Sequence, residues 1–221
     1  LEPGERFLAF IHVPHHTETP RTLVNVERMC SSRPPARPSK KLRLFVAVYP
    51  PPETAVALLA SLTKLDLPPN RLVGPEQVHL TLHFIGETPA PKIDAIAETV
   101  RHAAGGLDSF ALTPLQLITL PQRPPVRLVA AETDRPATLM ELQRRLVTRL
   151  ARNPRYRAGD RFRPHLTLCR LRSPAKFPAI EVSLGLPPFV VETIALVRST
   201  LRPQGAHHET VRAIHLSRRF P

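Results

Sequence analysis

Apolar and polar residues follow two different spacings along this chain of 221 residues, and proline or glycine separates the segments. Runs that are apolar at every position or at every second position predict strands, whereas apolar residues every three or four positions predict helices. Strands are expected at residues 42–48, 78–85, 110–120, 126–131, 165–171, 190–201 and 210–216. Helices are expected at residues 52–65, 91–104 and 136–152. Strand and helix therefore alternate, and much of the order is repeated in the second part of the chain.

Three short segments recur at almost the same distance along the sequence. The recurring pairs are 43–47 with 127–131 at an offset of 84, 126–128 with 211–213 at 85, and the motif 79–82 with 165–168 at 86. A shared offset is much less expected by chance than any single match. Two copies are too few for a solenoid, which needs about three or more. We therefore expect a duplicated lobe, with the two lobes facing each other across a pseudo-twofold axis.

The repeated motif is His79-Leu80-Thr81-Leu82 in the first copy and His165-Leu166-Thr167-Leu168 in the second. Successive side chains of a strand point to opposite faces. The two leucines of each copy then share the core face, and the histidine and threonine share the other. Two facing lobes would bring both His-Thr pairs to one cleft.

Two imidazoles across a cleft suit acid–base chemistry on a phosphodiester. A neutral imidazole removes a proton from the attacking group, and an imidazolium protonates the leaving oxygen, both near neutral pH. The threonine hydroxyls can donate hydrogen bonds to the nonbridging phosphate oxygens. A single copy of the motif would more simply be an ordinary half-buried strand segment, but its repetition at the common offset favours a functional role.

Three stretches carry a specific resemblance to a known family: residues 43–48, residues 79–87 (HLTLHFIGE) and residues 161–170 (RFRPHLTLCR). The chain resembles the two-histidine (2H) phosphoesterase superfamily and, more narrowly, the RNA 2′,3′-cyclic phosphodiesterases, also called 2′-5′ RNA ligases. The resemblance extends over about residues 42–217. It implies a bilobal, duplicated α+β fold, in which two antiparallel sheets face a central cleft and helices pack outside.

The resemblance also implies an enzymatic activity. A 2′,3′-cyclic phosphate at an RNA 3′ end is opened to a 2′-phosphomonoester, and the family also joins RNA ends through 2′-5′ linkages. His79 and His165 are implied as catalytic residues, and Thr81 and Thr167 as phosphate-binding residues, with no cofactor and no metal. We assign His79 as the acid for the ribose 3′ oxygen and His165 as the base for water, although the near symmetry of the site leaves the reverse assignment open.

Two further residues are candidates for substrate contacts. Arg170 lies five residues after His165, where close family members also carry an arginine near the phosphate. Strand alternation places Arg170 on the face opposite His165, so it reaches the cleft only if the strand ends or bulges there. Phe45 is a candidate for stacking on a base, but its apolar neighbours make a place in the core an equal alternative.

Positive charge is in large excess, at a formal net charge of +13. Such a surplus favours anionic partners, above all nucleic acid, although arginine-rich composition also follows from genomic base bias. Arginines crowd the second motif, and either line a groove for RNA phosphates or form a solvated loop: Arg152, Arg155, Arg157, Arg161, Arg163, Arg170 and Arg172. Four histidines form no recognisable motif with other residues and are expected on the surface or in loops: His102, His207, His208 and His215.

Residues 1–40 differ from the rest and are expected to form a disordered extension and linker ahead of a two-lobed domain at 41–221. The two cysteines, Cys30 and Cys169, do not indicate a disulfide framework. No apolar run reaches the ~20 residues that a membrane helix needs, and the first residues lack the pattern of a secretory signal. We expect a cytoplasmic monomer that is not associated with a membrane and whose partner is RNA with 2′,3′-cyclic phosphate ends.

Three functional hypotheses follow. The first is a metal-independent phosphodiesterase acting on RNA ends, and the second is a cyclic phosphodiesterase acting on a small nucleotide. The third is a noncatalytic RNA-binding protein on the same scaffold. Two complete His-Thr pairs argue against the third, because binding alone does not need two titratable groups.

Overall fold

The computed structural model describes residues 40–150, 162–202 and 205–217. Short 3-10 turns follow the first helix and precede the third strand and the second helix. In chain order the elements are β1 (Lys41–Val48), α1 (Pro52–Ala60), β2 (Asn70–Leu72), β3 (Leu80–Pro89), α2 (Ile93–Ala104), β4 (Phe110–Leu112), β5 (Pro114–Leu120), β6 (Val126–Thr133), α3 (Ala137–Leu150), β7 (His165–Ala175), β8 (Glu181–Ser183), β9 (Phe189–Val191), β10 (Thr193–Arg202) and β11 (Gly205–His215).

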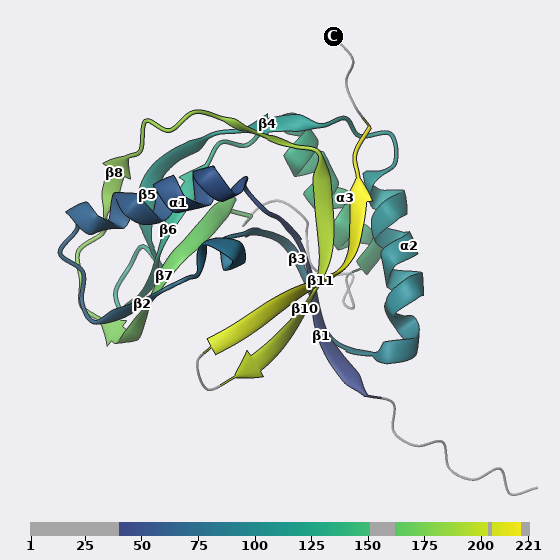
Figure 1. The fold of residues 1–221 in the computed structure, drawn as a ribbon, viewed down its shortest axis with the longest axis horizontal. Coiled ribbons are helices and arrows are strands. Elements are labelled where there is room, and N and C mark those ends of the chain that lie inside the picture. The colour runs from purple at the N-terminus through teal and green to yellow at the C-terminus, as the bar shows by residue number, and fades with distance from the viewer. Residues whose placement is uncertain (1–39, 151–161, 203–204, 218–221) are drawn as a thin grey trace, which may run out of the picture. The chain divides into compact units, whose positions relative to one another are not determined.

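The main sheet has nine strands and is built from two halves (Figure 1). Its order is β11-β10-β1-β3-β7-β6-β5-β8, and β2 pairs with β7 beside this path. Within the described residues, the halves are joined through one residue pair, Leu80 of β3 and Leu166 of β7. Strands β4 and β9 form a separate two-stranded sheet. The halves correspond to the two expected lobes, and they meet along a narrow seam.

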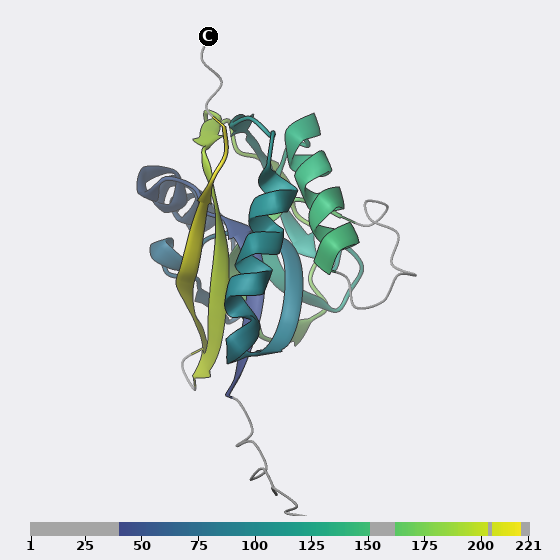
Figure 2. The same cartoon turned by 90° about the vertical axis from the view of Figure 1, so that its right-hand side faces the viewer.

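Helices α2 and α3 lie side by side against one half of the molecule (Figures 1 and 2). Arg145 of α3 donates a hydrogen bond of 2.8 Å to the main-chain oxygen of Gly105, directly after α2. Gly106, with φ at 71°, turns the chain away from the helix, in a conformation that a residue with a Cβ rarely adopts. This contact locks the end of α2 to α3.

Strand β1 shows how alternation divides the interior into two clusters. Leu44, Val46 and Val48 are buried in the main core, together with the inward leucines of the motifs. Phe45 and Ala47 point to the other face and are buried in a smaller cluster with Ala195 and Val197 of β10. The first half therefore has apolar packing on both faces of its sheet.

The expected fold class is confirmed: the protein is α+β, with antiparallel strands in two related halves. The two expected sheets are, however, continuous through the Leu80–Leu166 pair. The short strands β2 and β8 were not predicted, and β11 begins earlier than expected, at Gly205. The predicted extension lies outside the described residues except for Lys40. No helix in the described residues is long and apolar enough to cross a membrane.

Candidate active site

The Leu80–Leu166 pair lies at the centre of the candidate site. Both leucines are fully buried, so the neighbouring residues on each strand point to the opposite face. Extending this antiparallel register by one residue on either side puts His79 across from Thr167, and Thr81 across from His165. The four side chains predicted from the sequence therefore gather on one face, around the local twofold axis of the seam. All four are half-buried.

Each histidine makes the same hydrogen bond to the residue two positions before it. Nδ1 of His79 lies 2.7 Å from the carbonyl oxygen of Gln77, and Nδ1 of His165 lies 2.7 Å from that of Arg163. Because a carbonyl can only accept, the proton of each neutral imidazole is on Nδ1. In both copies Nε2 is then left to exchange protons with a substrate.

A bulge lies at the last residue of each motif and changes which face the next residues occupy. On β3 the register against β1 skips Leu82, and on β7 the register against β6 skips Leu168. The skipped residues are 86 positions apart, like the motifs themselves. Bulges re-aim the side chains that follow them. Beyond them, Phe84 lies opposite Phe45, and Arg170 lies opposite Leu128.

Arg170 is exposed, and the bulge turns it to the same face as His165. Its charge contributes to lowering the pKa values of His79, His165 and His208, so it acts on all three imidazoles of the site. Arg71 of β2 is its direct cross-strand neighbour. Strand alternation predicted that Arg170 reaches the face of His165 only if the strand ends or bulges, and β7 has a bulge at Leu168.

The two halves differ at the position beside each histidine. His79 is accompanied by Tyr49, with ring centroids 5.6 Å apart. His165 is instead the register partner of Glu132. Burial raises the pKa of Tyr49 to about 12, so its hydroxyl stays neutral. One histidine thus has an aromatic neighbour, and the other has a carboxylate.

Arg163 holds that carboxylate in an ion pair. Its Nε and Nη2 donate to the two oxygens of Glu132 at 2.5 and 3.0 Å. Gln116 donates to Glu132 at 2.9 Å. The bond from Arg163 is the main cause that lowers the pKa of Glu132. Arg163 is one of the arginines expected to line a groove for RNA or to form a solvated loop, and its side chain is engaged within the protein. Arg152, Arg155, Arg157 and Arg161 lie outside the described residues.

His79 is enclosed by rings. Phe45 and His208 have ring centroids 5.0 and 4.8 Å from that of His79. Phe45 is only 3% exposed, whereas Phe84, whose centroid is 6.0 Å from that of Phe45, is 72% exposed. Stacking of a base on Phe45 stays a prediction, and its burial favours the alternative of a packing role.

His208 was expected on the surface or in a loop, and this expectation is wrong. The residue lies on β11, half-buried, with its ring against His79 and Phe45. Nothing in the local sequence indicates this position, because it depends on how β11 pairs with β10 and reaches the first motif. Of the other histidines in that prediction, His102, His207 and His215 are exposed.

Both catalytic candidates have lowered pKa values. Burial is the main cause that lowers the pKa of His79 to about 4, opposed by the bond to Gln77 and supported by the charges of His208, Arg170 and His165. The pKa of His165 is also lowered, mainly by burial, then by Arg163 and Arg170, and is raised by its bond to the Arg163 carbonyl and by Glu132. Both imidazoles of the free protein are therefore mainly neutral at pH 7.

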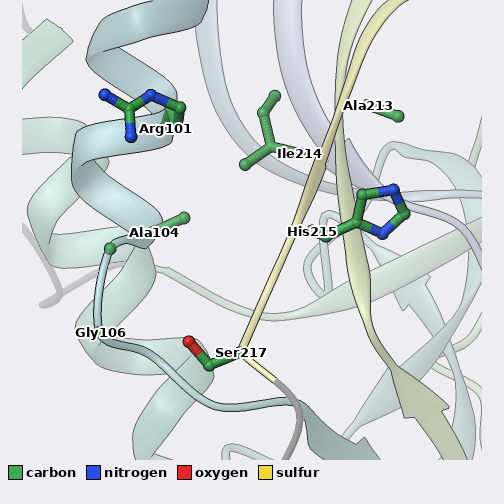
Figure 3. Close-up of a pocket in the computed structure, with 8 residues that line it drawn as sticks. Arg101, Ala104, Gly106, Ala213, Ile214, His215 and Ser217 are labelled. Carbon is green, nitrogen blue, oxygen red and sulfur yellow. The ribbon is translucent and has the colours of Figure 1, made fainter.

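Two hollows among the described residues are lined by other residues than these histidines. One of about 370 Å³ lies between the end of α2 and β11. Figure 3 shows Ile214 directed toward α2 and His215 on the other side of the strand. Arg101 at this hollow is bound to Glu98, and His215 to Thr193. The described residues also contain no group of three or more potential metal ligands.

Comparison with known proteins shows the family of this chain. The family model of the 2′-5′ RNA ligase superfamily matches residues 50–203, and the chain belongs to this family. A relative from Thermus thermophilus, named RNA 2′,3′-cyclic phosphodiesterase, is 35% identical over 175 residues, which cover 74% of this chain and 85% of the relative. A relative of the same name from Thermotoga maritima is 29% identical over 136 residues, covering 60% and 72%.

Solved structures show the same fold. A protein from Thermus thermophilus superposes with a TM-score of 0.66 and 29% identity, covering 79% of this chain and 98% of that one. The apo form of E. coli LigT superposes with a TM-score of 0.65 and 25% identity, covering 81% and 99%. The overall fold is therefore shared with these proteins.

Proposed function

We propose that this protein hydrolyses the 2′,3′-cyclic phosphate at the 3′ end of RNA to a 2′-phosphomonoester. The observation that carries the proposal is the symmetric placement of His79, Thr81, His165 and Thr167 around the seam. Three curated relatives named RNA 2′,3′-cyclic phosphodiesterase support the substrate class. All four side chains come from one chain, so the proposed reaction needs only a monomer.

The reaction needs one proton removed and one delivered. Water attacks phosphorus, a new P–O bond forms, and the bond between phosphorus and the ribose 3′ oxygen breaks. Nε2 of one histidine takes the proton of the water, and Nε2 of the other protonates the 3′ oxygen. Because both Nδ1 atoms are engaged by carbonyls, Nε2 is the exchanging nitrogen of each histidine, and these bonds alone do not decide which histidine is the acid. The two histidines can make this exchange without a metal.

The assignment of acid and base stays a prediction. His79 was assigned as the acid for the 3′ oxygen, and His165 as the base. In the free protein the pKa of His79 is about 4, so its imidazole is neutral. A general base must be neutral, so this pKa opposes the assignment of His79 as the acid. A bound phosphate anion stabilises an imidazolium beside it, so the substrate itself brings the acid into its protonated state.

The phosphate and the nucleobase of the substrate are expected to bind at separate places. The hydroxyls of Thr81 and Thr167 have no hydrogen-bond partner among the described residues and are available to the nonbridging oxygens. Arg170 supplies the positive charge from the second half of the sheet. Phe84, the exposed aromatic ring on the first half, offers a flat surface for a nucleobase, with Phe45 buried behind it.

The same geometry supports the family's joining reaction as a second activity. Attack by a 5′ hydroxyl of another RNA in place of water makes a 2′-5′ linkage and requires the same proton transfers. A cyclic mononucleotide is the alternative substrate, and a noncatalytic RNA-binding role is the alternative function. The repeated bond from each Nδ1 argues against the latter, because it prepares Nε2 for proton transfer rather than for simple contact.

The test uses purified full-length protein, an RNA ending in a 2′,3′-cyclic phosphate, a cyclic mononucleotide, and EDTA throughout. We expect turnover of the RNA to a 2′-phosphate. His79→Ala and His165→Ala should each lower kcat by about 10²–10⁴-fold, the usual contribution of one acid or base. His102→Ala, an exposed histidine on α2, is the control and should match the parent protein.

The outcomes separate the hypotheses. Absence of turnover with either substrate would reject the enzyme. Faster turnover of the mononucleotide than of RNA would favour the small-nucleotide alternative. Full activity in either histidine variant, with an unchanged circular dichroism spectrum, would remove that residue from the mechanism.

A further inference from the structure

His208 is a third imidazole in contact with the proposed catalytic residues. Its ring meets that of His79 at a centroid distance of 4.8 Å and an interplanar angle of 84°. It meets Phe45 at 5.0 Å and 73°. Such edge-to-face contacts are favourable at these distances. The His79 ring is therefore held by rings from both β1 and β11.

Gln77 connects the main chain of His208 to the side chain of His79. Oε1 of Gln77 accepts a hydrogen bond of 2.9 Å from the main-chain N–H of His208. Nε2 of Gln77 donates to the main-chain oxygen of His208 at 3.5 Å. The carbonyl oxygen of Gln77 accepts the bond from Nδ1 of His79. One residue thus sets both the position of β11 and the tautomer of His79.

His165 is fixed in an equivalent way, but through an ion pair instead of the amide contacts of Gln77. Arg163, 86 positions after Gln77, accepts the bond from Nδ1 of His165 with its carbonyl and binds Glu132 of β6 with its side chain. Each half therefore fixes its histidine through the residue two positions earlier, and that residue is anchored to a neighbouring strand. The duplication of this arrangement indicates that it serves the histidines and not only the local packing.

The hairpin that carries His208 is held at another point as well. The guanidinium of Arg71 on β2 lies against Gly205, where a methyl group would overlap it. Gly205 also has φ at 123°, which disfavours other residues. Arg71 and Gln77 both belong to the segment that leads into His79. This segment therefore holds the β10–β11 hairpin against the site from two places.

The side chain of His208 is not placed there to satisfy its own polar atoms. Its Nδ1 is buried and has no hydrogen-bond partner among the described residues. A buried unpaired nitrogen costs stability, so its presence here calls for another explanation. The contacts of the ring supply one, because they restrict the orientation of His79.

We propose that His208 is a positioning residue for His79: its ring, anchored through Gln77, holds the His79 imidazole so that Nε2 faces the seam. The expected effect of His208 on activity rests on the proposed function. His208 need not touch the substrate, because it acts through the imidazole ring that it contacts.

The test compares His208→Phe, which keeps a flat ring, with His208→Ala, which removes it, in the full chain. His207→Ala, the exposed neighbour on the same strand, is the control. We expect His208→Ala to lower kcat by about 10–100-fold, as loss of a supporting partner usually does, with a smaller change in KM. His208→Phe should retain most of kcat, and its melting temperature should not fall, because the unpaired nitrogen is gone. Gln77→Ala should lower kcat in the same direction.

Nuclear magnetic resonance of the His79 ring supplies a readout that does not depend on activity. In the parent protein we expect one tautomer with the proton on Nδ1, and in His208→Ala a mixture of tautomers and a higher pKa as water reaches the ring. An unchanged kcat and an unchanged His79 signal in His208→Ala would overturn the proposal. Equal loss of kcat in His208→Phe and His208→Ala would also overturn it, because the imidazole itself would then be needed. If the parent protein turns over no substrate, the proposed function fails, and the tautomer still decides the role of His208.

Discussion

His79 and His165 make the same hydrogen bond but have different neighbours. Phe45, Tyr49 and His208 give His79 aromatic surroundings, whereas His165 lies beside the ion pair of Arg163 and Glu132. Burial disfavours the charged form in both. A site that is nearly symmetric in sequence is therefore asymmetric in its electrostatics.

The lowered pKa values predict the pH dependence of the reaction. Catalysis needs one neutral and one protonated imidazole, and above both pKa values the protonated fraction falls tenfold for each pH unit. Because both values lie below 6.5 and that of His79 is about 4, kcat/KM should reach its maximum on the acidic side of pH 6.5. Initial rates with the cyclic mononucleotide between pH 4 and 8 measure this. A maximum above pH 7 would contradict it.

Arg170 is expected to bind the phosphate. Its removal should weaken both ground-state and transition-state binding, so Arg170→Ala should lower kcat/KM by roughly tenfold or more, as loss of a charged hydrogen bond of ~1.5–3 kcal/mol does. Arg170→Lys should recover part of the loss, because a point charge remains. Arg149→Ala, an exposed arginine on α3, is the matched control. Equal kinetics in Arg170→Ala and the control would remove Arg170 from the site.

At the level of single residues, the sequence predicted the catalytic candidates but not all of their neighbours. The histidines and threonines could be found because a repeated motif on a strand has only two possible faces. The face of Arg170 could not be settled by alternation, because one skipped residue, Leu168, reverses it. His208 could not be found at all, because its contact with His79 joins residues far apart in the chain.

Among the elements, β3 and β7 matter most for the site. They share a single pair in the described residues, so the strands diverge on either side of Leu80 and Leu166. The helices and most long strands were predicted, with shifted ends. The expected strands 110–120 and 190–201 are each divided in two, and their short parts β4 and β9 form the separate sheet. Strands β2 and β8 were missed because each has only three residues, too few to show a periodic pattern.

The seam should be sensitive to loss of volume. Leu166 is fully buried, so Leu166→Ala should lower the free energy of unfolding by about 2–5 kcal/mol through lost burial and the cavity left behind. Leu115→Ala, at a leucine of β5 that is 46% exposed, should change it by much less. Unfolding in urea, followed by circular dichroism, gives both values. Equal effects would show that the seam is not tightly packed.

For the whole molecule, the net charge of +13 bears on which substrate is preferred. If RNA phosphates beyond the cyclic end contact arginines, KM for RNA should rise with salt, whereas KM for a cyclic mononucleotide should change little. Three such contacts would give roughly a twentyfold rise between 50 and 200 mM salt, from the dependence known for single strands. Parallel measurements with both substrates decide this. The same weak dependence for both would indicate that only the cyclic end is bound.

The duplicated organisation, the α+β class and the four central side chains could be predicted from the sequence, because strand alternation and a repeated motif depend only on local order. Three features became visible only in the folded chain: the halves join through Leu80 and Leu166, Arg170 turns to the face of the histidines, and His208 packs against His79. These features depend on register, bulges and the pairing of distant strands. The free energy that selects them comes from packing between segments that the sequence leaves far apart.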